Sequence, residues 1–426
     1  MEIYNLVSFA GIFILLALAW LFSANRREIN WAVVIWGVGL QMLFALFIFV
    51  FPWGIKFFYF LNDLVVKVMD CSMAGSKFVF GPLGESSSGF ILAFQAFPTI
   101  IFFSALMAIL YFYNVIPAII RFFAFLFTRL MKVSGAEALC TASNIFVGVE
   151  SVLTVRPFVK DMTASELCTV LTAGMATVAS SMLGVYTLML HDQFPMIAGH
   201  LISASLMSAP AALVISKMLL PESGQPKTLG ENVELVIEKE EHLLEAIIKS
   251  AYTGVQLIVG IVALLVAVLG LVALLNTIFV ALGAQVNQFF QISLDWSLKG
   301  LLGYIFYPFT LILGIPPMDA KILAGIIGER LVVTELTSYQ DLASALSQGI
   351  LQDPRSVVIA TYALCGFAHV ASMAIFVGGV SAIAPSQTGV LAKIAFRSLI
   401  AANLACLLTA CVAGTFFLQG STILSL

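Results

Sequence analysis

Residues 144–152 have the sequence Asn-Ile-Phe-Val-Gly-Val-Glu-Ser-Val and lie within a long apolar region of the chain. They place an amide, a carboxylate and a hydroxyl close together, and an acidic residue at the centre of a membrane helix costs roughly 2.5–3.5 kcal/mol on insertion scales. Gly148 predicts an interruption of the helix, where backbone polar groups are free to bind a ligand. Such interruptions at membrane depth occur only against protein or a water-filled cavity. The stretch therefore predicts a binding site.

The composition predicts an integral membrane protein in a lipid bilayer. Of the 426 residues, 61% are hydrophobic and 10% are charged, whereas soluble domains carry about 25% charged residues. Several apolar runs reach the ~20 residues that a spanning helix needs. The net charge of −3 gives no sign of nucleic-acid binding. The sequence has no Walker A loop or dinucleotide fingerprint, so we expect no cofactor and no ATP-driven transport.

The apolar runs predict an all-α polytopic protein with about eight crossing helices and two re-entrant helical hairpins. The crossings are expected at residues 6–23, 32–52, 91–119, 166–190, 195–216, 253–275, 353–380 and 398–418. An amphipathic segment at 54–90 is expected to lie along the membrane interface. The first hairpin, 134–162, turns at Gly148. In the second, 298–340, one helix ends at Gly314-Ile-Pro-Pro317 and a single return helix carries Glu335.

The basic residues indicate how the chain crosses the membrane. Arg26 and Arg27 follow the first crossing, and Arg121, Arg129 and Lys132 follow the third. The positive-inside rule places both clusters in the cytoplasm, and the N- and C-termini then lie outside. The chain divides into N-terminal spans with an interfacial helix (1–95), a first repeat (96–220), a cytoplasmic loop (221–250) and a second repeat (251–426).

An internal repeat relates the two halves. Gly174-Met-Ala-Thr-Val-Ala-Ser180 and Gly366-Phe-Ala-His-Val-Ala-Ser372 agree at five of seven positions. Each copy follows a hairpin that carries a glutamate, and the predicted topology gives the two copies opposite directions. Inverted repeats with interrupted helices are typical of secondary transporters, which bind their substrate at the repeat interface.

Glu150 and Glu335 are the strongest candidate site residues, because both lie beside an interruption. Their carboxylates can accept hydrogen bonds from the hydroxyl or ring N–H groups of a neutral polar solute. Asn144 and the carbonyl of Val147 offer oxygen ligands to a small cation near a helix end. Thr177 and the carbonyl of Val178 can complete such a site. The alternative for Thr177 is an ordinary hydroxyl bond within its own helix.

The second repeat adds three candidates. His369 has two functional interpretations, hydrogen bonding to the substrate or proton handling, and packing alone is the alternative. Ser372 lies one helical turn further along and shares its face. Phe367 can stack on a flat ring, although plain packing also accounts for an aromatic residue there.

Several of these motifs resemble the concentrative nucleoside transporter family. They are Asn144-Ile-Phe-Val-Gly148, the glutamate that follows, Val155-Arg-Pro-Phe158, Thr334-Glu335, Ala363-Leu-Cys-Gly-Phe-Ala368 and Ser372. The resemblance implies a homotrimer in which a transport domain moves like an elevator against a scaffold that includes residues 1–95. It also implies import of nucleosides together with sodium or protons.

The resemblance further assigns roles to individual residues. The base would face Gly148, Val149, Glu150 and Met182. The ribose would contact Glu335, His369 and Ser372, with Phe367 alongside. Sodium would bind Asn144, the Val147 carbonyl, Thr177 and the Val178 carbonyl, and the retention of Asn144 and of a hydroxyl at 177 favours sodium over protons.

The chain departs from the family pattern at two places. The family usually has Gly-Gln-Thr/Ser-Glu at the first hairpin tip, where this chain has the shorter Gly148-Val149-Glu150-Ser151. An asparagine usually stands where this chain has His369. The lost glutamine amide prevents transfer of the family's base preference, and the histidine can alter the sugar tolerated or add a dependence on pH.

These observations predict a sodium-driven secondary active importer of nucleosides in a bacterial inner membrane. One alternative is a proton-coupled transporter of nucleosides or of a nucleoside-like solute. An intramembrane enzyme with Glu150, Glu335 and His369 as acid–base groups is a second alternative, but it leaves the repeat unexplained. A channel is disfavoured because the two hairpins are expected to close the pathway from opposite faces.

Overall fold

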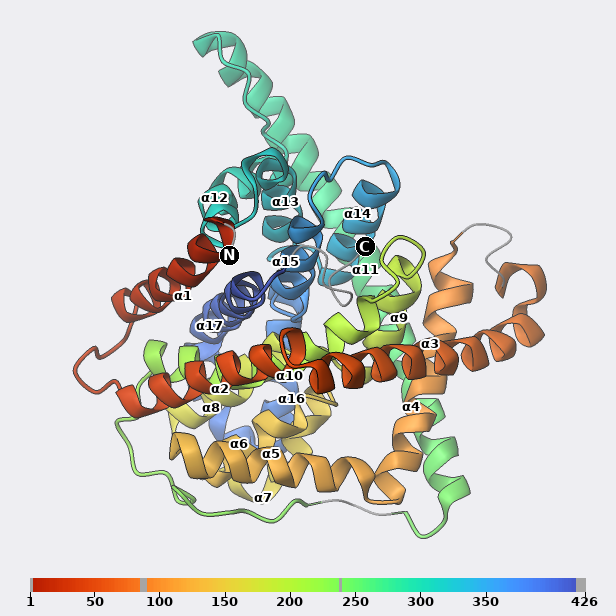
Figure 1. Ribbon diagram of the computed structural model, residues 1–426, viewed down its shortest axis with the longest axis vertical. Helices are drawn as coiled ribbons and strands as arrows, with labels where there is room; N and C mark the ends of the chain where they lie inside the picture. The colour runs from red at the N-terminus through yellow and green to blue at the C-terminus, as the bar shows by residue number, and fades with distance from the viewer. Residues whose placement is uncertain (1–2, 85–89, 237–239, 419–426) are drawn as a thin grey trace.

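The computed structural model of the chain describes residues 3–84, 90–236 and 240–418, without the side chain of Val149 (Figure 1). Every regular element in these ranges is a helix, and one isolated bridge pairs Ser134 with Leu229. The described helices therefore agree with the predicted all-α class. Parts of the predicted amphipathic segment 54–90 and of the predicted cytoplasmic loop 221–250, and both chain ends, lie outside the described residues.

The first half of the chain contains α1 (Ile3–Leu21), α2 (Trp31–Phe49), α3 (Pro52–Phe80), η1 (Gly81–Gly84), η3 (Leu92–Ala96), α4 (Phe97–Phe112), α5 (Val115–Met131), α6 (Gly135–Ser143), η4 (Val149–Val155), α7 (Arg156–Val159), α8 (Ala164–Ala176), α9 (Ser180–Leu190) and α10 (Ile197–Leu219). The second half contains α11 (Leu243–Phe290), α12 (Leu298–Ile312), α13 (Pro317–Glu329), α14 (Glu335–Ser347), α15 (Pro354–Leu364), α16 (Val370–Ile383), η5 (Pro385–Gln387) and α17 (Thr388–Thr415).

Seven helical stretches among the described residues are long and apolar enough to cross a membrane. One of them, 164–190, combines α8 and α9, which are separated by an interruption at 177–179. The predicted crossing at 353–380 is likewise divided, into α15 and α16, and neither piece alone has spanning length. Both interruptions fall within the repeated sequence motif.

The prediction of one crossing at 91–119 is wrong in its extent. The spanning helix α4 ends at Phe112, and residues 115–119 begin α5 instead. The chain turns at Asn114, whose φ of 62° is left-handed, a conformation that asparagine tolerates better than most residues. The new helix packs against α6 and α2 along the lower edge of the molecule (Figure 1).

The prediction of a single return helix in the second hairpin is also wrong. After the turn at Gly314, which has a φ of 80°, α13 ends at Glu329 and α14 begins at Glu335. Residues 330–334 therefore form a second interruption. Thr334 caps α14 by accepting a hydrogen bond from the Thr337 N–H, and threonine at this position favours a helix start over a helix interior. Glu335 thus begins a helix rather than lying within one.

The second half repeats the order of the first. In each half, a helix packed against the hairpin (α5 or α12) precedes a short helix (α6 or α13), an interruption and a return segment (η4 or α14). An interrupted crossing helix and a long buried helix (α10 or α17) follow. These two long helices pack against each other at the centre, and 89% and 94% of their most apolar stretches are buried.

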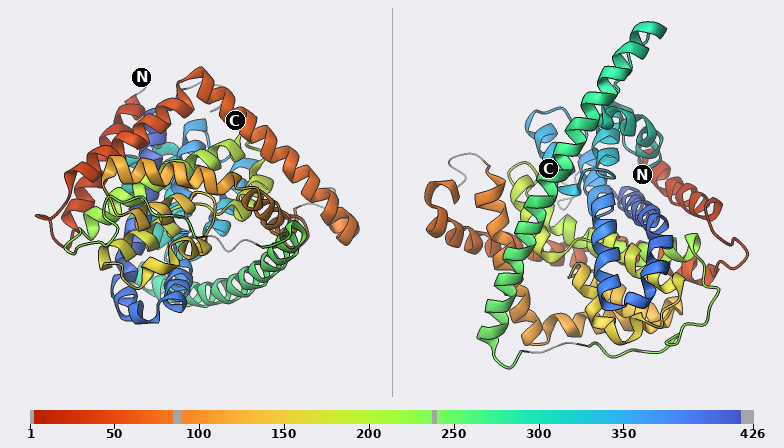
Figure 2. Two further views of the ribbon diagram at one scale, coloured as in Figure 1. Left: turned by 90° about the horizontal axis from the view of Figure 1, so that it is seen from below. Right: turned by 180° about the vertical axis from the view of Figure 1, so that it is seen from behind.

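One long helix stands apart from this core. α11 packs mainly against α4, and none of its most apolar 18-residue stretch is buried within the chain. It runs along one side of the molecule and extends beyond the body at its upper end (Figure 2). Its exposed apolar residues therefore need lipid or another protein surface to cover them.

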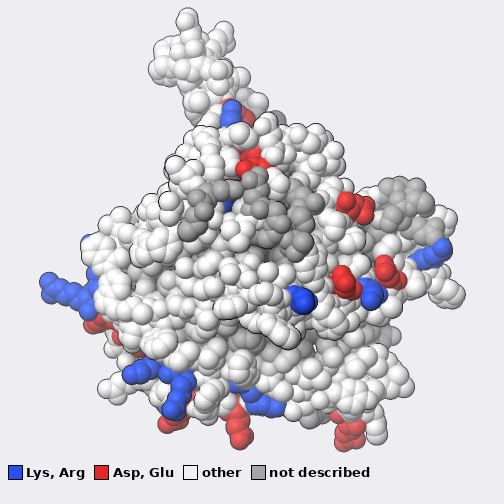
Figure 3. All heavy atoms as spheres, viewed as in Figure 1, with Lys and Arg blue, Asp and Glu red and all other residues white. Residues whose placement is uncertain are grey.

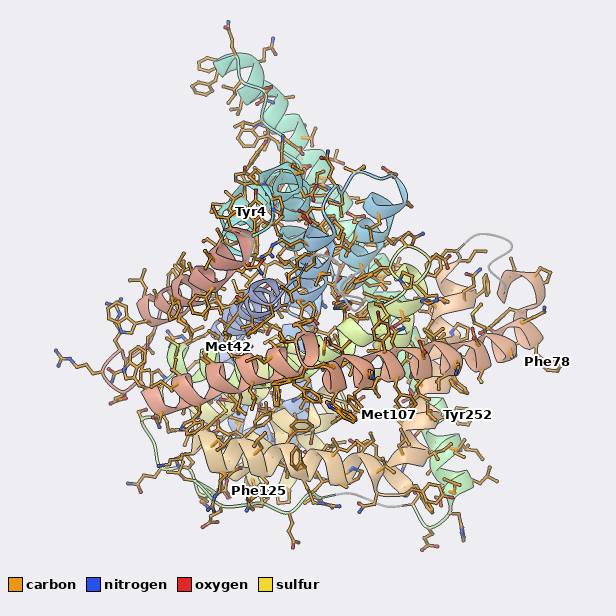
Figure 4. All side chains as sticks on the ribbon, in the orientation of Figure 1. Tyr4, Met42, Phe78, Met107, Phe125 and Tyr252 are labelled. Carbon is orange, nitrogen blue, oxygen red and sulfur yellow. The ribbon has the colours of Figure 1, made fainter. Side chains whose placement is uncertain are left out.

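The charged side chains on the face shown in Figure 3 lie mainly along the lower edge, along α3 and at the α1–α2 connection. The surface between them is largely uncharged. Phe78, which is 91% exposed, lies at the far end of α3 (Figure 4). This distribution fits an apolar belt bounded by polar edges.

The segment 221–236 is fastened to the base of the first hairpin, although it was expected to be a solvated loop. Gly135 N donates to Thr228 O over 2.8 Å, and Val236 N donates to Thr154 O over 3.3 Å. A buried ion pair lies beside these bonds, with Lys217 Nζ 2.9 Å from a Glu137 carboxylate oxygen. The segment therefore holds α6 and η4 to the chain that leads into α11.

Candidate functional site

The first candidate region is the interruption at 144–148, which we call the first break. α6 ends at Ser143 and η4 begins at Val149, so the predicted break at Gly148 is confirmed. Two of the intervening carbonyls have partners from other helices. Ser205 Oγ donates to Ile145 O and Ser180 N donates to Phe146 O, both over 3.0 Å. The second of these bonds places the first break directly against the interruption between α8 and α9.

The oxygens predicted to bind a cation lie in these two interruptions. Asn144 Oδ1 accepts a hydrogen bond from Ser151 Oγ over 2.9 Å, while its Nδ2 donates to Cys140 O over 3.0 Å. This pattern fixes which end of the amide is the oxygen. Thr177 Oγ1 donates to Ala173 O over 2.9 Å, which is the intrahelical bond that was the alternative interpretation. A hydroxyl that donates keeps its lone pairs, so both oxygens can still act as ligands.

The second candidate region centres on Glu335, the first residue after the interruption at 330–334, which we call the second break. Tyr186 OH donates to Glu335 Oε1 over 2.7 Å, and His369 Nε2 lies 2.9 Å from Glu335 Oε2. Both Glu335 and His369 are 4% exposed. Because Tyr186 belongs to α9 and Glu335 to α14, the carboxylate lies where the two repeats meet.

The ring of His369 is oriented by the helix that it caps. Its Nδ1 accepts the Ser372 backbone N–H over 3.2 Å, so the ring proton resides on Nε2, which faces Glu335. The contact is close but not aligned, and Glu335 Oε2 accepts no hydrogen bond from the described residues. This oxygen is buried and oriented, and it keeps room for a donor from a ligand.

The hydroxyl of Ser372 is already engaged. Its single proton can go to the carbonyl of His369, 3.0 Å away, or to that of Phe367, and its oxygen accepts the His369 N–H over 3.4 Å. Ser372 therefore has an acceptor function left for a ligand. Phe367 is partly buried and packs against the core, as the packing interpretation expected.

A cavity of about 540 Å³ opens beside the first break. Its wall includes Val147, Gly148 and Glu150 from the break, Ser180 from α9, and residues of α4, α11 and the 221–236 segment. Met107 of α4 contributes an apolar part of this wall (Figure 4). The volume lies in the range of small-molecule sites. Glu335 and His369 do not line it, so the two candidate regions differ in their access to this cavity.

The structure brings most predicted residues into one of these two regions. Met182 lies in the first turn of α9 and is 6% exposed, and Val178 is 2% exposed. Gly148 approaches α9 closely, since a Cβ built on it would lie 3.5 Å from the Ala179 Cβ. The side chain of Val149 lies outside the described part of the chain.

Tyr186 was missed in the sequence, and Ser151 was noted as the hydroxyl of the 144–152 stretch without a role. Tyr186 binds the Glu335 carboxylate and stacks on Tyr339, with ring centroids 4.6 Å apart. Ser151 binds the Asn144 amide oxygen. Tyrosine in an apolar helix carries no sequence signal of its own, because its partner lies 149 positions away. Ser151 had a signal, since it adjoins a candidate glutamate.

Family models match most of the chain. Residues 10–83 match the N-terminal model of Na⁺-dependent nucleoside transporters, and residues 200–414 match the C-terminal model. Residues 93–193 match a gate model described as nucleoside recognition. Together these ranges contain both breaks and the helices that hold them.

Curated relatives align with almost the whole chain. Solute carrier family 28 member 3 of Mus musculus is 36% identical over 96% of this chain and 58% of its own length. Sodium/nucleoside cotransporter 1 of Rattus norvegicus is 35% identical, covering 97% of this chain and 64% of the relative. An uncharacterized transporter of Haemophilus influenzae is 35% identical over 98% of this chain and 99% of its own. The chain thus spans about three fifths of the mammalian relatives.

Solved structures have the same fold. The transporter CNTnw in an inward-facing, substrate-bound state has a TM-score of 0.87 at 31% identity, covering 97% of this chain and 98% of that one. A variant of the same protein in an outward-facing state has a TM-score of 0.88 at 30% identity and the same coverage. The predicted polytopic fold is therefore confirmed.

Proposed function

Because the chain belongs to the family of Na⁺-dependent nucleoside transporters, we propose that it is a secondary active importer that couples nucleoside uptake to a sodium gradient. The observation that carries this proposal is the bond from Tyr186 to Glu335, which joins the two repeats at a buried carboxylate. Secondary transporters bind their substrates at such an interface. The family consists of transporters, so the intramembrane-enzyme alternative is set aside.

The proposed substrate site has a base side and a ribose side. On the base side, Gly148 and Glu150 line the end of the 540 Å³ cavity that reaches the first break, and we propose that Val149 and Met182 also face the base. On the ribose side, Glu335 Oε2 accepts a hydrogen bond from a ribose hydroxyl. His369, Ser372 and Phe367 lie beside it. A ribose hydroxyl is the donor that this orphaned oxygen lacks, and leaving a buried acceptor unpaired is costly.

Sodium is the proposed co-transported substrate. Its ligands would be Asn144 Oδ1, the Val147 carbonyl, Thr177 Oγ1 and the Val178 carbonyl. All four are neutral oxygens, which suit a small hard cation better than a transition metal.

The proposed sodium site and the base side of the substrate site both lie at the first break, which would couple sodium binding to nucleoside binding. Sodium at Asn144 would order the first break, and Glu150, which begins the next helical segment, would then meet the substrate. Each ligand would thereby raise the affinity for the other by the same factor. We propose that the cavity beside the 221–236 segment is the exit toward the cytoplasm.

An elevator movement would carry both breaks across the membrane. We propose that α3, α4 and α11 form the scaffold, since α4 and α11 pack along each other. This revises the predicted scaffold of residues 1–95, because α1 packs against α17 and α2 against α10. The uncovered apolar length of α11 supports a homotrimer in which copies of α11 meet. We place the protein in a bacterial inner membrane, with both termini outside.

A proton-coupled transporter is the second candidate, and the contact between His369 and Glu335 favours it. Protonation of the imidazole would strengthen that contact and weaken the hold of Glu335 on a ribose hydroxyl. The two candidates differ in the gradient that they require.

Uptake into proteoliposomes tests the proposal. Labelled nucleosides should accumulate against their gradient when sodium is high outside, and accumulation should vanish with sodium replaced by choline at fixed ionic strength. Accumulation driven by a pH gradient in choline would select the proton-coupled candidate. No gradient-dependent uptake of any purine or pyrimidine nucleoside would contradict both.

A further inference from the structure

The two breaks take the same place in their repeats, although the second is one residue shorter between its helix cap and its glutamate. The first has the sequence Asn144-Ile-Phe-Val-Gly-Val-Glu150 and the second Arg330-Leu-Val-Val-Thr-Glu335. Asn144 caps the C-terminus of α6, and Arg330 caps that of α13. In both, a glutamate lies at the start of the helical segment that follows. Arg330 therefore stands in the second repeat where Asn144 stands in the first.

The backbone contacts of the breaks agree with this correspondence. In the first repeat, Ser180 N at the start of α9 donates to Phe146 O over 3.0 Å. In the second, Val370 N at the start of α16 donates to Leu331 O over 3.1 Å. Each break is thus held to the interruption of the crossing helix in its own repeat.

Arg330 places a positive charge inside the second break. The side chain is fully buried, and its guanidinium donates to Ala363 O and, over 2.7 Å, to Asn403 Oδ1. Ala363 lies in the last turn of α15, where carbonyls lack helical partners and the helix dipole is negative. Both of these acceptors are neutral oxygens, as are the proposed sodium ligands in the first repeat.

Asn403 secures this arrangement from a third helix. Its Nδ2 donates to Ala368 O and Leu399 O, both over 3.0 Å. The amide therefore presents its oxygen to Arg330 and its nitrogen to the chain that leads into His369. The guanidinium, Asn403 and the start of α16 form one connected network.

We propose that Arg330 is a fixed, untransported cation that takes the place of a second sodium ion, and that it limits coupling to one sodium ion per nucleoside. The inference rests on the proposed sodium coupling. Arg330 is a positioning residue, because it acts on the substrate site by holding the second break beside Glu335 and His369. With Arg330 replaced by a neutral residue, the neutral oxygens around it would form a second site that must be filled by a mobile cation.

Dual-label flux in proteoliposomes tests this inference. The wild-type protein should move one sodium ion per nucleoside, with a Hill coefficient for sodium near one. Arg330→Asn, which copies the residue of the first repeat, should lose about 90% of its uptake at low sodium and recover at high sodium with a Hill coefficient approaching two. Arg330→Lys keeps the charge and should retain a coefficient near one.

Thermal unfolding of purified protein in detergent gives a second readout that does not need transport. Sodium, with choline as the ionic-strength control, should stabilise the wild-type protein with one-site behaviour and Arg330→Asn with two-site behaviour. Arg355→Gln is the matched control, since Arg355 is also fully buried and donates to backbone carbonyls such as Gly314 O, away from both breaks. It should lower stability without changing the number of sodium sites.

A wild-type ratio of two sodium ions per nucleoside would overturn the inference and leave the proposed function intact. One-site behaviour of Arg330→Asn in both assays would also overturn it. Absence of any sodium-dependent uptake by the wild-type protein is a different result, because it would contradict the proposed function itself.

Discussion

The first and second breaks have similar backbone arrangements but differ in burial and in access to the cavity. The first break adjoins a 540 Å³ cavity, and the side-chain oxygens of Asn144 and of Thr177 in the neighbouring α8–α9 interruption bind a hydroxyl and a carbonyl group. The second is buried, with Glu335 held by Tyr186 and His369 and with Arg330 inside. The first break opens to a cavity, whereas the second is closed off and keeps Glu335 Oε2 as a buried acceptor without a hydrogen bond from the described residues.

This difference suggests a division of work between the repeats. The first break is open to ions and substrate, so its order would depend on whether they are bound. A prebuilt region can orient the substrate without rearrangement, which lowers the cost of binding. Four substitutions test whether the contrast is real, and we give them in order of decreasing expected effect.

Glu335→Gln should have the largest effect, because it removes the charge on which the prebuilt region is centred. Hydrogen bonds to a charged group contribute roughly 1.5–3 kcal/mol each, so we expect the kcat/KM of uptake to fall at least about 100-fold. Initial rates in proteoliposomes measure it. Glu329→Gln, six positions earlier and paired with Lys299 at 3.1 Å, is the control and should stay near wild type. Unchanged uptake by Glu335→Gln would remove this carboxylate from the site.

Asn144→Ala should act on the first break and therefore weaken sodium binding. We expect the sodium concentration for half-maximal uptake to rise roughly tenfold, as the loss of one oxygen ligand worth roughly 1–1.5 kcal/mol implies. Asn62→Ala is the matched control, because the Asn62 amide, like that of Asn144, both donates and accepts: it donates to Pro195 O and accepts from Gly199 N. An equal sodium response in the two variants would contradict the assignment.

His369→Asn should alter selectivity more than overall rate. Asparagine is a preferred helix N-cap, so α16 should still begin at the same place. Without the imidazole beside it, Glu335 Oε2 should accept a ribose hydroxyl more readily. We expect preference for ribonucleosides over 2′-deoxyribonucleosides to rise about fivefold, equivalent to roughly 1 kcal/mol. Competition uptake with matched pairs measures this, and an unchanged ratio would separate His369 from sugar recognition.

Tyr186→Phe should have the smallest effect. The substitution removes the bond to Glu335 Oε1 but keeps the stacking on Tyr339, and it leaves Glu335 Oε2 beside His369. We expect a decrease in kcat/KM of about threefold, roughly 0.6 kcal/mol, because Tyr186 positions the carboxylate and has no contact with the nucleoside in the proposed site. A decrease in kcat/KM as large as that of Glu335→Gln would mean that uptake depends on the Tyr186 hydroxyl as much as on the Glu335 charge.

Much of the first break was predictable from the sequence, because Asn144 and Glu150 are conspicuous in an apolar run. The family motifs also located Glu335, His369 and Ser372. The interruption at 330–334 was not foreseen, since Leu331-Val-Val333 continues an apolar pattern and the cap at Thr334 is a local signal within it. The division at Asn114 was missed for the same reason.

The partners of the site residues were less predictable than the residues themselves. Tyr186 and Glu335 lie in different repeats, and so do not share any local pattern. Arg330 appeared to be one more polar residue of a return helix, and only the fold places it opposite the C-terminus of α15. Contacts between side chains far apart in the sequence depend on how the helices pack, and a single sequence does not show that packing.

The fastening of the 221–236 segment has a consequence for the range of any domain movement. Its last described bond joins Val236 to Thr154, and α11 begins at Leu243, so residues 237–242 alone connect the first hairpin to the proposed scaffold at this end. A connection of that length spans at most roughly 20–25 Å when fully extended. The length of this connection therefore limits how far the first hairpin can move from the start of α11 while these bonds hold.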